Sequence, residues 1–460
     1  MARNRRTDTR TLKSPPEQKP DTARWVAAVV LERVTDEGAY ASRALDAELN
    51  RAQLEARDAG LATEIVYGSL RVLPELDRIV ATRLARVDAR MDGFVRATLR
   101  SAAYQLWHLA RLPSHAIVDE SVAQVRKKRG PKLAGFVNAL LRRLAEARPA
   151  EPMPPTALAL PEWINGVLLR ALGPERLASF LAHAALPAGL CLRADRQSQA
   201  ELLERLRTAL PGADIAPTAL SPLGVLVRRV GSPRGLPGYA EGAFSLQEEG
   251  AQLLALALGA QPGERIADVC AGHGGKTTLL ARLIGAQGQL CALDKDERKL
   301  LAIPKELERI GLGAVPLELH PVDLSVGTGG LGATFDRVLV DAPCTGLGTA
   351  HRRPELLLRL KPEDPARLGA LQLSILDRAA GLVRPGGLLG YAVCSPTSEE
   401  GSEVARAFSA AHPQFRLLLE RQNERLPAPD PDGVLHIGPW LAPGQTGPDA
   451  YQLVLWRRSE

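Results

Sequence analysis

The sequence lacks the features that mark membrane-spanning, secreted and zinc-finger proteins. Its 460 residues contain no apolar run of the roughly 18–20 residues that a membrane span requires. Residues 1–20 are polar, basic and proline-containing and lack the apolar centre of a secretory signal, so we expect a disordered basic tail. The five cysteines are odd in number and show no C-x-x-C spacing, which argues against a disulfide framework or a zinc site. We therefore expect a cytoplasmic protein with neither a membrane nor a metal as partner.

Basic charge is concentrated in the first third of the chain. Residues 1–150 carry 27 Lys and Arg against 18 Asp and Glu, whereas residues 151–460 carry 31 against 34. The net charges are therefore +9 and −3. A basic region joined to a near-neutral one favours a polyanion, RNA or DNA, as the partner of the first region. Basic charge that merely keeps a surface solvated is the alternative.

Residues 21–147 show helical spacing of their apolar side chains and no strand signal, which predicts an all-α domain. Asp21 is the expected cap of the first helix. Further helices are expected at about 41–53, 56–72, 74–87, 91–110, 114–129 and 133–147. The basic cluster Arg126–Arg129 fits a phosphate contact and, equally well, a helix end that complements the helix dipole.

Four segments of this region resemble the NusB family of RNA-binding antitermination domains in their order and spacing. They are Ala62–Arg71, Leu99–Trp107, Pro113–Val122 and Gly135–Arg142. The resemblance implies an RNA-binding helical bundle.

A proline-rich linker, 148–160, separates this domain from the rest of the chain. Residues 161–240 combine a helical pair, a further helix and two strand-like stretches, which predicts a small α+β subdomain. Lying between an RNA-binding bundle and a catalytic sheet, this subdomain is expected to line an RNA groove or to act as a spacer.

Residues 241–460 alternate between strand and helix patterns, which predicts a Rossmann-like, doubly wound α/β sheet. Pro304 should kink the helix that follows the second strand. The last two strands have only a Pro/Gly-rich loop between them, so we expect an antiparallel pair at one edge. The predicted strands are 265–270, 289–294, 314–320, 335–342, 386–394, 414–420 and 450–457.

The stretch Arg265–Asp294 predicts a nucleoside site. A buried strand is followed by three glycines within four positions and by a helix that begins near Lys276. Asp294 follows Gly275 by 19 residues, where a carboxylate can accept hydrogen bonds from a ribose. A merely structural turn between strand and helix is the alternative.

The same stretch lacks the glycines of phosphate-binding motifs. A P-loop needs a glycine where the chain has Cys270, and G-x-G-x-x-G needs one where it has Thr277. A site with a ribose ligand but no phosphate ligand suggests S-adenosylmethionine.

Reactive side chains follow several predicted strands: Asp268, Asp294, Asp323, Asp341 with Cys344, and Cys394. The carboxyl ends of parallel strands share one edge of a sheet, where open α/β folds bind ligands. A cysteine near a methyl donor suits methylation of pyrimidine carbon 5, because a thiolate that adds to carbon 6 makes carbon 5 nucleophilic. Methylation of a nitrogen needs no thiol.

Residues 244–400 resemble the RNA cytosine-5 methyltransferases of the ribosomal small-subunit type, the RsmB (Fmu/Sun) group. The matching segments are Phe244–Gln252, Asp268–Cys270 with Gly274–Thr277, Asp294, Asp323, Asp341–Cys344, Arg353–Glu355, Leu371–Gln372 and Tyr391–Ser395 with Glu399–Glu400. The resemblance implies a class I S-adenosylmethionine-dependent methyltransferase domain. It also implies 16S rRNA as the substrate. The oligomeric state stays open, and the default expectation is a monomer that meets the RNA before subunit assembly is complete.

The resemblance implies a role for each matching residue. Cys394 is the nucleophile on carbon 6, Cys344 helps to release the product, and Asp341 contacts cofactor and base. Lys276 positions Asp341 or the substrate. Within the cofactor site, Asp294 matches the ribose ligand and Asp323 the residue near the adenine. The full set of implied cofactor-binding residues is Cys270, Ala271, Gly272, His273, Gly274, Gly275, Lys276, Asp294, Asp323 and Asp341.

The chain departs from the family pattern at two places. Gly272-His273 replaces the usual Ala-Pro, and Val393 stands where Thr is usual. Three alternatives stay open at this stage. Cys344 could attack instead of Cys394, as a Pro-Cys does in DNA cytosine-5 methyltransferases; the substrate could be tRNA; or the chain could be a non-catalytic RNA-binding assembly factor.

Overall fold

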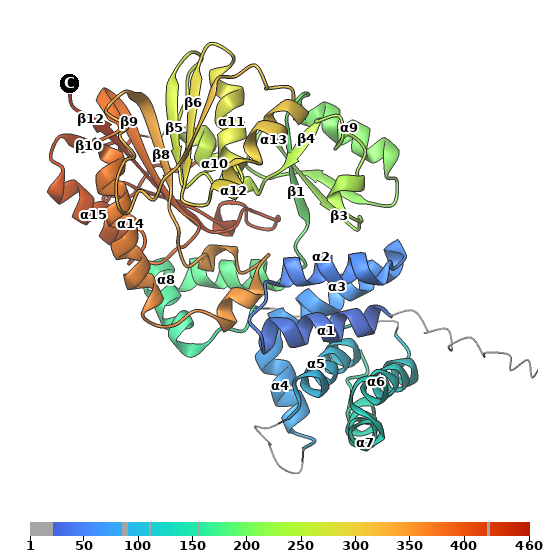
Figure 1. The fold of residues 1–460 in the computed structure, drawn as a ribbon. Helices are drawn as coiled ribbons and strands as arrows, with labels where there is room; N and C mark the ends of the chain where they lie inside the picture. The colour runs from blue at the N-terminus through green and yellow to red at the C-terminus, as the bar shows by residue number, and fades with distance from the viewer. Residues whose placement is uncertain (1–21, 85–90, 110–111, 152, 154–156, 421–423) are drawn as a thin grey trace, which may run out of the picture.

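The computed structural model describes residues 22–84, 91–109, 112–151, 153, 157–420 and 424–460 (Figure 1). The predicted tail, 1–20, and part of the predicted linker lie outside these residues. Among the described helices, none combines the length and the apolar character needed to cross a bilayer.

The N-terminal part is a helical domain, as the sequence predicted. Its helices are α1 (Ala23–Thr35), α2 (Ala41–Ala52), α3 (Ala56–Arg71), α4 (Leu73–Ala81), α5 (Gly93–His108), α6 (Ser114–Arg129) and α7 (Pro131–Glu146). The cap of α1 is Thr22 rather than Asp21: the Thr22 side chain accepts a hydrogen bond from the backbone N–H of Trp25. Helix α5 is the central element, because nearly all of its residues are buried.

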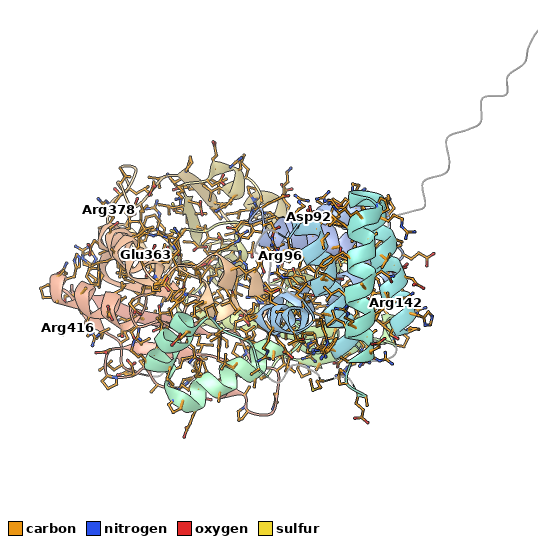
Figure 2. The ribbon with its side chains drawn as sticks, turned by 90° about the horizontal axis from the view of Figure 1, so that it is seen from below. Asp92, Arg96, Arg142, Glu363, Arg378 and Arg416 are labelled. Atoms are coloured by element: carbon orange, nitrogen blue, oxygen red, sulfur yellow. The ribbon has the colours of Figure 1, made fainter. Side chains whose placement is uncertain are left out.

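The basic cluster at the end of α6 is largely engaged within this domain. Lys128 Nζ lies 2.7 Å from Glu32, and Arg129 Nε lies 2.8 Å from Asp92. Lys127 lies over the ring of Trp25, 4.6 Å from its centroid. Arg142, on α7, is exposed on the side of the domain that faces away from the catalytic sheet (Figure 2). The outer face of α7 is therefore a better candidate for phosphate contact than the paired cluster.

Helix α8 (Glu162–Ala185) is interrupted at Gly173, where φ is 71°, before Pro174. This interruption produces the predicted helical pair. We had expected this helical pair to share the core of the small α+β unit, but it does not. It packs instead against the loops of the catalytic domain, where Ile164, Leu168 and Phe180 are buried against Leu347 and its neighbours.

The small α+β unit is a four-stranded sheet in the order β2-β3-β1-β4, with one helix, α9, packed on it. Its elements are β1 (Leu190–Ala194), α9 (Gln199–Ala209), β2 (Asp214–Pro217), β3 (Gly224–Arg228), η1 (Pro233–Gly235) and β4 (Phe244–Leu246). Strand β4 lies beyond residue 240, where we had placed the domain boundary, yet it pairs with β1. The unit is therefore fastened to the start of the catalytic domain by a strand.

The catalytic domain is a doubly wound sheet in the order β10-β12-β9-β8-β5-β6-β7. Its strands are β5 (Arg265–Val269), β6 (Gln289–Asp294), β7 (Leu317–Pro321), β8 (Phe335–Asp341), β9 (Val383–Val393), β10 (Phe415–Leu417), β11 (Val434–Ile437) and β12 (Tyr451–Arg458). The strands from β5 to β9 pair in parallel, and β12 pairs antiparallel with β9 and β10. The predicted antiparallel edge is therefore confirmed, whereas β11, inside the Pro/Gly-rich loop, was not predicted.

Helices cover both faces of this sheet (Figure 1). One face carries α10 (Glu249–Ala257), α11 (Gly275–Ile284), α12 (Glu297–Leu300) and α13 (Ile303–Arg309). The other carries α14 (Asp364–Ala380) and α15 (Ser402–Ala411). Pro304 lies in the first turn of α13 and separates it from α12, as predicted. Short 3₁₀ turns η2 (Leu347–Thr349), η3 (Pro354–Leu358) and η4 (Pro439–Leu441) lie in the connecting loops.

The helical domain touches the catalytic domain at η3. The backbone N–H of Ala41 donates to Glu355 Oε1 at 3.4 Å, and the guanidinium of Arg359 lies over the Tyr40 ring, 4.1 Å from its centroid. Because η3 belongs to the loop that follows Cys344, this contact connects the helical domain with the edge of the sheet where the reactive residues gather.

Candidate active site at the carboxyl edge of the sheet

The turn after β5 has the tight backbone that the glycines predicted. Gly272 and Gly274 have φ values of 58° and 82°, and Cys270, a non-glycine residue, has a φ of 62°. A β-carbon at Gly274 would lie 2.7 Å from the Ile303 side chain, so the turn also needs a glycine there for close packing. A left-handed conformation at a cysteine costs on the order of 1 kcal/mol, and such strained residues are common at ligand sites.

Asp294, at the end of β6, is held by this turn. One carboxylate oxygen accepts the backbone N–H of Gly272 at 2.9 Å, and the other accepts that of Asp296 at 2.8 Å. Two backbone donors fix the carboxylate, and each oxygen keeps a second lone pair for a ligand.

A cavity of about 220 Å³ opens beside this carboxylate. Five of the predicted cofactor residues line it: Cys270, Gly272, Asp294, Asp323 and Asp341. Its apolar walls include Leu293, Leu324, Leu371 and Ile375. Ala271, His273, Gly274, Gly275 and Lys276 are not among its lining residues. His273, the unusual residue of the loop, is exposed.

Asp323 follows β7 and is exposed at the rim of the cavity. Its Oδ1 accepts hydrogen bonds from the Ser325 hydroxyl at 2.6 Å and from the Ser325 backbone N–H at 2.9 Å. These bonds hold the pKa of Asp323 below its ordinary value. Asp323 therefore adds a charged carboxylate to a cavity whose walls are partly apolar.

Asp268 lies beneath the turn and is almost fully buried. Burial raises the pKa of Asp268 to about 7, against the opposing effect of the Thr277 hydroxyl, which donates to Oδ2 at 2.6 Å. Its Oδ1 has no hydrogen-bond partner in the described part of the chain. These features fit S-adenosylmethionine. Its methionine end carries an ammonium donor, which suits the unpartnered oxygen of Asp268 and the glycine turn, and its ribose suits the Asp294 carboxylate.

Arg193 is a fully buried residue that the sequence analysis missed. From β1 it donates to the Gly275 carbonyl at 3.0 Å, to the Thr278 hydroxyl at 3.1 Å and to Gln247 at 2.7 Å. Through Arg193, the small sheet thus contacts and stabilises the first turn of α11. Arg193 also pairs with Asp195, two residues further along the chain, at 2.7 Å. No local pattern pointed to its role at α11, because Gly275 and Thr278 lie 82 and 85 residues away in the sequence.

The two candidate catalytic cysteines meet at the other end of the edge. Cys344 follows β8 and Cys394 follows β9, and their sulfur atoms lie 3.2 Å apart. The thiols are free and partly buried. At this distance one thiol can donate a hydrogen bond to the other sulfur.

The surroundings distinguish the two sulfurs. The hydrogen bond from Cys344 lowers the pKa of Cys394, and the positive charges of Lys276 and Arg353 lower it further, against burial and the charge of Asp341. The pKa of Cys344 is raised by its hydrogen bond to Cys394, by burial and by the charges of Cys394, Glu400 and Asp341. Cys394 is therefore the sulfur that is more readily a thiolate.

Lys276 bridges the cofactor turn and the cysteines. It occupies the first turn of α11, and its Nζ donates to Asp341 Oδ2 at 2.5 Å. Burial alone would lower the pKa of Lys276, but the adjacent Asp341 carboxylate outweighs burial and raises it. Lys276 is thus a permanent cation near Cys394.

Glu400 joins the two cysteine loops and was given no role by the sequence analysis. Its fully buried carboxylate accepts the backbone N–H of Thr345 at 2.7 Å, the hydroxyl of Ser395 at 2.6 Å and the amide of Gln372 at 3.1 Å. The hydroxyls of Thr345 and Thr397 also donate to it. Thr345 and Ser395 each follow a cysteine directly, so Glu400 fixes the separation of the two sulfurs. The only sequence signal for it was its place in the family motif.

Arg353 connects the helical domain with Cys394. Its guanidinium lies 5.9 Å from the centroid of the Tyr40 ring, and its charge lowers the pKa of Cys394. Arg353 therefore lies against the helical domain and also places a positive charge near Cys394.

Comparisons with known proteins agree with this architecture. Residues 255–430 match the family described as 16S rRNA methyltransferase RsmB/F, and residues 21–146 match the NusB family. The chain is 33% identical over 395 residues to the ribosomal RNA small subunit methyltransferase B of Pseudomonas syringae pv. tomato, which covers 84% of this chain and 86% of that protein.

The corresponding protein of Thermus thermophilus is 37% identical over 396 residues, covering 86% of this chain and 89% of that one. The crystal structure of PH0851 superposes on 98% of this chain and 100% of its own, with a TM-score of 0.78 and 22% identity, so it shares the fold.

Proposed function

Because the chain belongs to the RsmB/F family of 16S rRNA methyltransferases, whose cofactor is S-adenosylmethionine, we propose that it methylates carbon 5 of a cytosine in 16S rRNA through a transient bond from Cys394. The observation that carries the proposal is the pair of sulfurs 3.2 Å apart, of which Cys394 has the lowered and Cys344 the raised pKa. A methyltransferase that modifies a nitrogen or an oxygen needs neither sulfur.

The proposed reaction begins with the Cys394 thiolate. Its sulfur bonds to carbon 6 of the cytosine, and the electron pair of the 5,6 double bond becomes available at carbon 5. S-adenosylmethionine, when bound, supplies an electrophilic methyl group. Carbon 5 forms a bond to this methyl while the methyl–sulfur bond of the cofactor would break and leave the neutral thioether S-adenosylhomocysteine. Carbon 5 then loses its proton to a base, the carbon 6–sulfur bond breaks, the double bond returns and Cys394 leaves as a thiolate. Cys344 is the group closest to the departing sulfur.

Asp341 and Lys276 have a positioning role in this scheme. Asp341 lines the cofactor cavity and receives the Lys276 ammonium, so it lies between the two reactants. Its carboxylate is a suitable acceptor for the exocyclic amino group of a cytosine, which uracil lacks. Asp341 is therefore the residue that we propose selects cytosine.

RNA is the substrate class of the family, and the helical domain supplies its RNA-binding surface. The net charge of +9 on residues 1–150 supports phosphate contacts there. We propose that the target is an RNA not yet enclosed by ribosomal proteins, because the helical domain and the cysteine edge must both reach it.

The test compares three cysteine variants of the full-length protein with 16S rRNA and S-adenosylmethionine. Cys394→Ser is expected to lose methylation by about 1,000-fold or more and to form no covalent complex. Cys344→Ser is expected to accumulate a denaturant-resistant protein–RNA adduct, because addition still occurs while release is slow. Cys191→Ser, at a cysteine outside the site, serves as the control.

Bisulfite sequencing of the treated RNA identifies the modified position. An adduct in Cys394→Ser and none in Cys344→Ser would exchange the roles of the two cysteines. Methylation of tRNA in preference to rRNA would change the substrate. Binding of RNA without binding of S-adenosylmethionine would make the protein a non-catalytic assembly factor.

A further inference from the structure

A second polar cluster lies behind the cysteines, outside the cofactor cavity. It consists of His183 on α8, His351 after η2 and Asp449 before β12, and all three side chains are buried. They come from segments that are 168 and 98 residues apart in the sequence. The proposed methyl transfer uses none of them.

The spacing within this cluster is wrong for hydrogen bonds. His183 Nε2 lies 3.7 Å from Asp449 Oδ1, and His351 Nδ1 lies 3.6 Å from the same oxygen. Hydrogen bonds between such atoms are about 2.7–3.2 Å long. Two ligands about 2.0–2.1 Å from one tetrahedral ion lie roughly 3.3–3.5 Å from each other, so the observed spacing is close to that of ligands sharing an ion.

The imidazoles supply a second, independent observation. His183 Nε2 is buried and has no hydrogen-bond partner among the described residues, and it is the atom that faces Asp449. A buried polar atom without a partner costs about 1–3 kcal/mol, and native structures contain few of them. The two rings are tilted by 59° with their centroids 4.1 Å apart, and one ligand atom from each of the three side chains lies within 4.8 Å of the others.

Asp449 is oriented to leave one oxygen for an ion. Arg352 donates to its Oδ2 at 2.7 Å, while Oδ1 faces the two imidazoles. Glu248 accepts the backbone N–H of Asp449 at 2.9 Å. The direct contacts of Asp449 thus comprise one guanidinium and a second carboxylate, so a cation at Oδ1 improves the local balance of charge.

We propose that His183, His351 and Asp449 bind one divalent transition-metal ion, and that Zn²⁺, which favours two imidazoles, a carboxylate and a water in a tetrahedron, is the best match. The usual sequence test for zinc looks for closely spaced cysteines, and it did not detect this set because the ligands are distant in the sequence and contain no sulfur.

The ion would have a structural role at the cysteine edge. Between Cys344 and His351, Gly348 donates its N–H to the Cys394 carbonyl at 3.0 Å and accepts the N–H of Ala450 at 3.1 Å. Ala450 follows Asp449 directly. An ion bound to His351 and Asp449 would therefore fix the position of the loop 345–350, which contacts Cys394. Through His183, the same ion would join this loop to α8.

The test measures metal directly in the full-length protein, produced with Zn²⁺ in the medium and dialysed against a weak chelator. Wild type is expected to retain about one zinc per chain by mass spectrometry. His183→Gln and His351→Gln are each expected to lose most of it, whereas His436→Gln, at a histidine paired with Asp430 elsewhere in the domain, should retain it. Co²⁺ in place of Zn²⁺ should give the visible absorption of a four-coordinate nitrogen and oxygen site.

Three results would overturn the proposal. Wild type could contain no metal and show no change in unfolding temperature with added Zn²⁺ or Co²⁺, a result that no folding defect of a variant can explain. The double variant His183→Gln/His351→Gln could keep the ion while folded, as judged by circular dichroism. The cobalt protein could show sulfur-to-metal charge transfer, which would assign the ion to the cysteines.

Discussion

The two halves of the active site are built in different ways. The cofactor half, comprising the turn 270–275 with Asp294 and Asp323, is held by backbone donors that lie close in the sequence or on the adjacent strand. The cysteine half, comprising Cys344, Cys394 and Glu400, is held by side chains from separate loops and is touched by the helical domain through η3. One half is a local structure, and the other depends on the assembly of the whole chain.

The halves also differ in their electrostatics. The cofactor half presents carboxylates fixed by N–H groups, which suit neutral hydroxyl donors and an ammonium group. The cysteine half directs two cations, Lys276 and Arg353, at one of two adjacent sulfurs. Substitutions should therefore separate binding of S-adenosylmethionine from the chemical step, and the variants below test this separation.

Lys276→Met should have the largest effect, because it removes a buried cation from the cysteine half. We expect kcat to fall by about 100-fold, while the Kd for S-adenosylmethionine changes by less than about 3-fold. Lys276 lowers the pKa of Cys394, so its loss raises that pKa and reduces the thiolate fraction at a given pH. The rising limb of the pH profile of kcat/KM should therefore move to higher pH.

Lys299→Met is the matched control for this variant, because Lys299 lies 4.0 Å from Asp294 in the cofactor half. It should leave the pH profile unchanged. An unchanged profile for Lys276→Met as well would show that Lys276 does not act on the thiolate.

Glu400→Gln should have the next largest effect. The amide keeps one acceptor oxygen but turns an N–H₂ group towards the donors that Glu400 now satisfies, from Thr345, Ser395 and Gln372. We expect a loss of about 2 kcal/mol in the free energy of unfolding and a fall in kcat of roughly 10- to 30-fold, with little change in cofactor affinity. Denaturant titration measures the free energy of unfolding, a methylation assay measures kcat, and isothermal calorimetry measures the cofactor affinity.

The neighbouring Glu399→Gln provides the control, because Glu399 is not part of this network. Equal losses in the two variants, or a loss of cofactor affinity in Glu400→Gln, would contradict the assignment of Glu400 to the cysteine half.

The sequence analysis predicted the backbone pattern of the cofactor half and the reactive side chains of the cysteine half, but not the buried side chains that support either half. The glycine turn, the strand ends and the spacing to Asp294 are local patterns, and the fold places them where a parallel sheet must. Arg193 and Glu400 each make contacts far along the chain, to Gly275 at 82 positions and to Thr345 at 55, and no spacing rule could identify these contacts. The sequence analysis placed helix α8 with the small α+β unit, whereas it packs against loops of the catalytic domain. The apolar pattern of a helix shows that one face is buried, but it does not show which element covers that face.

Asp294→Ala should have the smallest effect on the chemical step. Its removal leaves the N–H groups of Gly272 and Asp296 without acceptors and deprives a ribose of its carboxylate. We expect the Kd for S-adenosylmethionine to rise by roughly 10- to 30-fold, about the worth of one or two hydrogen bonds to a charged group. At saturating cofactor, kcat should stay within about 3-fold of wild type. A large fall in kcat at saturation would mean that the two halves are coupled through the turn, and the division of the site into independent parts would then fail.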